Sequence, residues 1–225
     1  MDIRFLGHAC FELSDGSSRV LIDPFLSGNP KAAAKPDELD PTHILLTHGH
    51  VDHILDAVEI AKRTGASCVG VVETANWLKK QGVEDVSDPN LGGTVEFDWG
   101  WVKLVQALHS SETPDGTVTY ASGLVVSIGG KTVYHLGDTC LFGDMKLIAQ
   151  RTPIDTALMP IGGHYTMDRH DAVVAAELIG APTVIPCHYD TFPPIETDAQ
   201  AFKADVESQT SSKVVVLEPG DSHSA

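Results

Sequence analysis

The segment THGHVDH at residues 47–53 holds four potential metal ligands, which are His48, His50, Asp52 and His53. The apolar run at residues 44–46 before it is typical of a buried strand, and the residues after it change to a helical period. A turn between a strand and a helix can direct several side chains toward one point. Imidazole nitrogens and carboxylate oxygens are ligands of Zn²⁺ and related ions, and four of them exceed what one tetrahedral ion takes from so short a turn. The segment therefore predicts two metal ions.

Around this segment the chain repeats one plan of secondary structure. Short β-rich runs separated by turn residues occupy residues 3–22 and again 94–136, and strand and helix patterns alternate over 44–81 and 141–217. This repeat predicts an α/β (α+β) protein of two similar halves, with sheets inside and helices outside. No linker rich in Pro, Gly or Ser separates the halves, so residues 1–225 are predicted to form a single domain.

Three further donors follow predicted strands. His109 comes after residues 101–108, Asp138 shortly after 132–136, and His188 shortly after 183–186. In open sheets with helical crossovers, binding sites gather at strand ends. We therefore expect these side chains to converge on the 47–53 segment, which gives seven donors for two ions.

Composition and charge limit the classes of partner. The chain has 42% hydrophobic and 20% charged residues, as an ordinary globular protein does, and its net charge of −16 disfavours nucleic acid and anionic membranes. A small-molecule substrate is the predicted partner, with no nucleic acid and no membrane. The chain start lacks the basic and apolar plan of a secretory signal, and the four cysteines are scattered, so a cytoplasmic location is predicted.

Further motifs have the order of a known family. They are LGHACF at 6–11, LIDPF at 21–25, GDT at 137–139, PIGGHYTM at 160–167 and PCHYDTFPPIE at 186–196. Together with residues 47–53 they resemble the metallo-β-lactamase superfamily over nearly the whole chain, and within it the small metal-dependent hydrolases similar to L-ascorbate-6-phosphate lactonase. The resemblance implies a four-layer αββα sandwich with a dinuclear site at one edge, between the two halves.

The same resemblance implies a ligand assignment. One ion would be held by His48, His50 and His109. The other would be held by Asp52, His53 and His188, with Asp138 as the bridge. Asp23 would accept a hydrogen bond and orient a ligand rather than bind metal. Zn²⁺ is the first expectation for both ions, and Mn²⁺ or Fe²⁺ also suit these ligands.

The expected activity is hydrolysis by a metal-bound hydroxide at an ester, lactone or phosphodiester bond of a small molecule. Asp52 is the candidate catalytic residue that would orient this hydroxide. His164 lies in a predicted loop, where substrate contact or proton transfer and simple exposure are equally good interpretations. His8, at the edge of the first strands, is a weaker candidate for substrate binding.

Other functions on this scaffold stay open. Diiron oxidoreductases share it, but such members carry Glu where this chain has His50, which favours hydrolysis. RNA-processing members bring an additional nucleic-acid-binding segment, and this chain shows no spare segment or basic patch. A non-catalytic metal-binding protein is a further alternative. Related members often associate, so a homo-oligomer is also expected.

Overall fold

Two mixed seven-stranded sheets form the centre of the protein. The computed structural model describes residues 1–225. The first sheet has the order β14-β1-β2-β3-β4-β5-β6 and the second β13-β12-β11-β10-β9-β8-β7. The strands of the first are β1 (Asp2–Gly7), β2 (Cys10–Ser14), β3 (Arg19–Ile22), β4 (His43–Leu45), β5 (Ser67–Val69), β6 (Val86–Ser87) and β14 (Ser222–Ser224). Those of the second are β7 (Thr94–Phe97), β8 (Gly100–Gln106), β9 (Ser122–Ile128), β10 (Lys131–His135), β11 (Thr156–Pro160), β12 (Thr183–Cys187) and β13 (Lys213–Val214).

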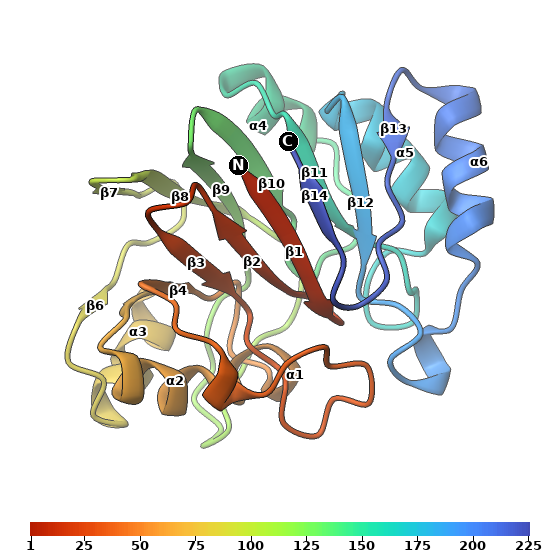
Figure 1. The fold of residues 1–225 in the computed structure, drawn as a ribbon. Coiled ribbons are helices and arrows are strands. Elements are labelled where there is room, and N and C mark those ends of the chain that lie inside the picture. The colour runs from red at the N-terminus through yellow and green to blue at the C-terminus, as the bar shows by residue number, and fades with distance from the viewer.

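Helices cover the outer face of each sheet (Figure 1). The α-helices are α1 (Val51–Ile54), α2 (Ala57–Thr64), α3 (Val72–Lys80), α4 (Met145–Arg151), α5 (Arg169–Ile179) and α6 (Ala199–Gln209), and two short 3-10 helices are η1 (Pro36–Glu38) and η2 (Pro193–Ile195). The first three α-helices pack on the first sheet and the last three on the second. None of these helices has the length and apolar character needed to cross a membrane.

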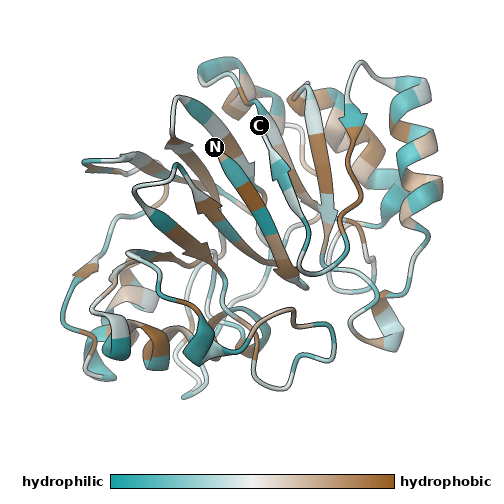
Figure 2. Cartoon of the chain, viewed as in Figure 1, coloured by the Kyte–Doolittle hydropathy of each residue, from teal (hydrophilic) through white to brown (hydrophobic).

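Three buried clusters hold the layers together. One lies between the sheets and contains Phe11 of β2 and Leu158 of β11. A second joins the first sheet to its helices through residues such as Leu21 and Ile60, and a third joins the second sheet to α4–α6 around Phe202. Figure 2 shows the hydrophobic residues concentrated on the strands, with hydrophilic residues on the outer surfaces of the helices. The predicted four-layer αββα sandwich is confirmed.

Two elements depart from the pattern in the sequence, and both departures occur next to the 47–53 segment. The predicted strand 118–128 begins only at Ser122, whose backbone N–H donates to the carbonyl of Thr47 at 2.9 Å. The residues before it form a loop beside the histidines. The helix predicted from His53 onward is split at Asp56, because its backbone N–H donates to the carbonyl of Pro24 at 3.1 Å and not to the preceding helical turn. The Asp56 carboxylate also accepts hydrogen bonds from the backbone N–H groups of Leu26 and Ser27 at 2.7 and 2.9 Å.

Candidate metal centre

All seven predicted donors meet at one edge of the sandwich. The 47–53 segment leaves β4 and enters α1, while His109, Asp138 and His188 follow β8, β10 and β12 of the other sheet. The ligand atoms of His48, His50 and His109 lie within 4.8 Å of one another. A second group within the same limit comprises Asp52, His53, His188 and also His8. The structure therefore places two donor groups side by side, each drawing on both halves of the chain.

Asp138 lies between the two groups. Its Oδ2 is 3.1 Å from His188 Nε2 and 3.5 Å from His109 Nε2, and its Oδ1 is 3.4 Å from His53 Nε2. His48 Nε2 lies 4.0 Å from Oδ2. The carboxylate is buried, with 3% of the residue exposed. Asp138 thus lies close to members of both groups.

These donors fit divalent metal ions. Zn–N bonds of about 2.0–2.1 Å at tetrahedral angles separate two ligand atoms by about 3.3 Å. His48 Nε2 and His50 Nδ1 are 3.0 Å apart, and the contacts of Asp138 with His188 and His53 span 3.1–3.4 Å. Buried polar atoms normally find hydrogen-bond partners, yet none is present for His53 Nε2, Asp138 Oδ1 or either ring nitrogen of His188. Bound cations would satisfy His53 Nε2, Asp138 Oδ1 and His188 Nε2, the ring nitrogen of His188 that faces Asp138.

A buried hydrogen-bond network selects the tautomers of two histidines. Asp23 Oδ2 accepts from the Thr47 hydroxyl at 2.5 Å and from His53 Nδ1 at 2.8 Å, and Oδ1 accepts from the Thr47 backbone N–H at 2.8 Å. Because the Thr47 hydroxyl donates to Asp23, its oxygen is free to accept from His48 Nδ1, 3.0 Å away. In their neutral forms, His48 and His53 therefore both direct an unprotonated Nε2 toward the centre, as metal ligands need.

The charges of the cluster are also suited to cations. Burial lowers the pKa of His48 well below its usual value, which keeps the ring neutral. Burial opposes ionisation of Asp138, but His188 and His53 outweigh it and hold the pKa of that carboxyl well below normal. Burial likewise opposes a charged His53, yet Asp138 and Asp23 outweigh it and raise the pKa of that ring. This site favours a positive charge between carboxylates, which a metal ion can supply in place of the proton.

A cavity of about 520 Å³ opens onto the cluster. It is lined by Phe25, His50, Val51, Asp52, His109, Ser110, Asp138, Tyr165 and Phe192. Aromatic and aliphatic side chains thus line the cavity together with the proposed ligands, and no Lys or Arg lies among the lining residues. Sequence reasoning gave Phe25, Tyr165 and Phe192 no role. All three lie within the quoted family motifs, but an apolar ring that only shapes a cavity has no chemistry of its own to single it out.

The structure does not place the two predicted substrate residues in this lining. His164 is exposed and has a φ of +56°. Its ring contacts that of Tyr165 in a T-shaped arrangement with 4.5 Å between ring centroids. His8 is buried beneath the centre, where its Nε2 lies 3.2 Å from Asp52 Oδ2. His164 is therefore adjacent to a lining residue, and His8 contacts a proposed ligand.

Gly162 packs closely against the backbone of His188. A Cβ at residue 162 would overlap the carbonyl oxygen of His188 and lie 2.8 Å from Ile195 Cβ. We expect Gly162→Ala to lower the free energy of unfolding by about 1–3 kcal/mol, because overpacking forces the backbone apart, and to weaken metal binding as His188 moves. Thermal melting and metal titration measure both effects. Gly143→Ala is the control, since a Cβ there meets no heavy atom within 4 Å; equal losses in the two variants would contradict the prediction.

Comparison with known proteins agrees with the fold and the cluster. A family model described as a beta-lactamase superfamily domain matches residues 2–188. UPF0173 metal-dependent hydrolases of Methanopyrus kandleri and Symbiobacterium thermophilum are 51% and 47% identical to this chain, each over 99% of both chains. Among solved structures, Igni18, a metallo hydrolase from Ignicoccus hospitalis, is 36% identical with a TM-score of 0.90, over 99% of this chain and 97% of that one.

The sandwich and its His/Asp cluster define a protein of the metallo-β-lactamase superfamily. Within that class, the chain belongs to the UPF0173 metal-dependent hydrolase family. The predicted enzyme class, a metal-dependent hydrolase, is confirmed.

Proposed function

We propose that the protein is a dinuclear hydrolase acting on an ester, lactone or phosphodiester bond of a small molecule. The observation that carries this proposal is the buried Asp138 carboxylate between two histidine groups. Two divalent ions, when bound, would lower the pKa of a coordinated water and polarise the bond to be cleaved.

The chain's own residues would divide the work of holding these ions. His48, His50 and His109 would hold one ion. Asp52, His53 and His188 would hold the other. Asp138 would contact both. Zn²⁺ is the ion we propose first, with Mn²⁺ or Fe²⁺ as alternatives for the same ligands.

Asp52 is the candidate for orienting the attacking water. Its side chain is 34% exposed and lines the cavity, unlike the buried Asp138. The His8 and His53 rings outweigh the burial of Asp52 and lower the pKa of its carboxyl, so the group is an ionised acceptor. An ionised carboxylate beside the cavity can accept a hydrogen bond from an attacking water and so orient it.

The cavity favours an uncharged acyl substrate among the three bond types. Phe25, Val51, Tyr165 and Phe192 offer apolar surface, whereas no Lys or Arg is present to pair with a phosphate. A likeness to L-ascorbate-6-phosphate lactonase, predicted from the sequence motifs, would favour lactone opening, but a phosphate group would depend on the metal ions alone for positive charge. We therefore propose an ester or lactone with an apolar substituent. We also propose that the protein forms a homo-oligomer and is located in the cytoplasm.

Metal analysis and a matched set of substrates test this proposal. The purified protein is expected to carry about two ions per chain, and chelation is expected to abolish hydrolysis until Zn²⁺ or Mn²⁺ is restored. A neutral aryl ester and an unphosphorylated lactone should be cleaved faster than a phosphodiester or the corresponding phosphorylated lactone. One ion or none per chain would contradict the dinuclear site. Iron with visible absorption and no hydrolysis would instead favour an oxidoreductase, and bound metal without turnover a binding protein.

A further inference from the structure

His8 adjoins the metal centre, and the proposed reaction leaves it without a role. It occupies the turn between β1 and β2 with a φ of +60°, a left-handed conformation that is uncommon for residues other than glycine. The residue is buried, with 1% exposed, and is absent from the lining of the cavity. Strained backbone of this kind persists where surrounding contacts hold it, often at functional sites.

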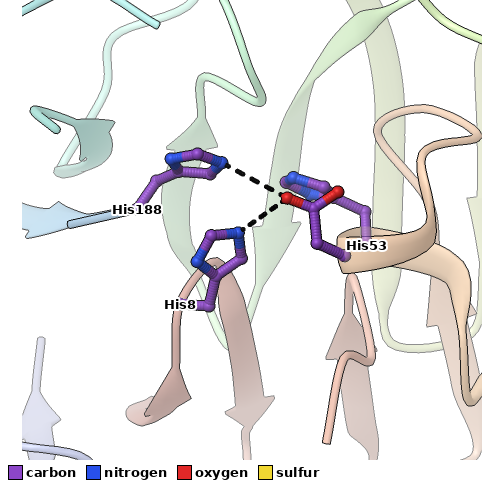
Figure 3. Close-up of side chains that lie close together, drawn as sticks. His8, His53 and His188 are labelled. Carbon is purple, nitrogen blue, oxygen red and sulfur yellow. Dashed lines mark hydrogen bonds and ion pairs between the residues drawn. The ribbon is translucent and has the colours of Figure 1, made fainter. Parts of the chain in front are cut away.

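The His8 ring joins the two halves of the protein. Its Nε2 lies 3.2 Å from Asp52 Oδ2 on α1, and its Nδ1 lies 2.9 Å from Thr191 Oγ1, beyond β12 of the second sheet. The ring centroid is 4.0 Å from that of His188. Figure 3 shows His8, His53 and His188 extending from three separate elements toward one another. One imidazole therefore contacts segments that carry proposed ligands from both halves.

The backbone of His8 makes a further contact with the same group. Its carbonyl accepts a hydrogen bond from the backbone N–H of His188 at 2.7 Å. His188 also has a positive φ, of +52°, so its conformation needs support from its neighbours. His8 thus holds the carboxylate of one proposed ligand with its side chain and the backbone of another with its carbonyl.

The hydrogen-bond partners indicate where the His8 proton lies. An ionised carboxylate only accepts hydrogen bonds, so Nε2 carries the hydrogen and donates to Asp52. Nδ1 then accepts from the Thr191 hydroxyl, whose other acceptor, the carbonyl of Tyr189, is farther away at 3.4 Å. With its Nε2 hydrogen directed at Asp52, the ring has no lone pair at that nitrogen for a metal ion. His8 therefore differs in role from Asp52, His53 and His188, although the potential ligand atoms of all four lie within 4.8 Å of one another.

We propose that His8 is a positioning residue that fixes the Asp52 carboxylate, with Thr191 fixing the His8 tautomer. This inference rests on the proposed metal centre and assigns a new role within it. A hydrogen bond to one oxygen of Asp52 holds the carboxylate in a single orientation, and partners of this kind set the affinity of a site as ligands do. Metal binding by the donor group that includes Asp52 should therefore depend on His8, while binding by the donor group that includes His50 should not.

Paired substitutions test the hydrogen bond separately from the bulk of the side chain. His8→Gln places an amide N–H at the same number of bonds from Cβ as Nε2, whereas His8→Met has the same length without a donor. Metal-free protein is titrated with Zn²⁺ against a chromophoric chelator. We expect His8→Met to lower the affinity for one of the two Zn²⁺ ions about 10- to 100-fold and to leave the affinity for the other unchanged. His8→Gln should restore most of this loss. His170→Met, at an exposed position on α5, is the control.

Thr191 provides a second pair that leaves the strained turn intact. Thr191→Val removes the hydroxyl and should weaken the same ion in a smaller degree, while Thr191→Ser retains it and should bind as the wild type does. Melting of each metal-free variant verifies its fold. Wild-type affinity for both ions in His8→Met and Thr191→Val would overturn this inference and leave the proposed function standing. Equal loss of one ion in His8→Met and His8→Gln would make His8 a ligand and also overturn it. A wild-type chain that binds no Zn²⁺ would refute the proposed function and this inference together.

Discussion

Asp138→Asn is expected to reduce hydrolysis at least about a thousandfold and to leave one bound ion or none. The carboxylate lies within 3.5 Å of three histidine nitrogens drawn from both donor groups. An amide of the same shape presents one neutral oxygen and an N–H₂ group that repels a cation. The expected loss in rate follows because metal ions contribute several kcal/mol of charge stabilisation in the transition state, and about 4 kcal/mol corresponds to a thousandfold change. Initial rates and metal content measured on the same sample test both parts.

The control for this variant is Asp144→Asn. Asp144 is an exposed aspartate six residues further on, and its side chain caps no helix. It should match the wild type in rate and in metal content. Melting of the metal-free Asp138→Asn protein separates loss of ligation from loss of fold. Two tightly bound ions and a rate within about tenfold of wild type would show that Asp138 is not the shared ligand.

The position of the metal centre could be predicted because its donors follow strands. Residues 47–53 and His188 show the rule clearly, since each lies just after a buried apolar run that becomes a strand, β4 and β12. Strands are recognised by local pattern, and the ends of neighbouring strands lie at one edge, so the convergence follows without knowledge of the loops. His109 and Asp138 obey the same rule at β8 and β10.

The contacts made by loops could not be predicted in the same way. The Asp52 interaction with His8 spans 44 residues and that of His8 with Thr191 spans 183, and neither pair has a periodic pattern. The break between α1 and α2 depends on Asp56 bonding a distant loop, which overrides a continuous helical pattern. The strands β6 and β14 hold only two and three residues, too few to establish an alternation.

Substitution of Asp23 is expected to have the second large effect, on stability as well as on metal binding. Asp23→Ala removes the acceptor for the Thr47 N–H, the Thr47 hydroxyl and His53 Nδ1, all of them buried. Breaking a buried hydrogen-bonded charge pair costs about 3–5 kcal/mol because its partners stay unsatisfied. In a chain of this size, 1 kcal/mol shifts the melting temperature by about 2–4 °C. We therefore expect the metal-free variant to melt about 6–20 °C lower.

Asp23→Asn separates the stability effect from the choice of tautomer. The amide N–H₂ fills the same space but faces donors. His53 is therefore driven to accept from the amide at an unprotonated Nδ1 and to carry its hydrogen on Nε2, the nitrogen that faces the metal centre. We expect a smaller loss of stability than in Asp23→Ala, yet Zn²⁺ binding weakened by about 10- to 100-fold, as for other residues that orient ligands. Chelator competition and melting of the metal-free proteins measure the two effects. Asp40→Ala, which removes an exposed aspartate paired with Arg63, should change both values little. If Asp23→Asn bound Zn²⁺ as tightly as Asp40→Ala does, the Asp23 network would not set the tautomer of His53.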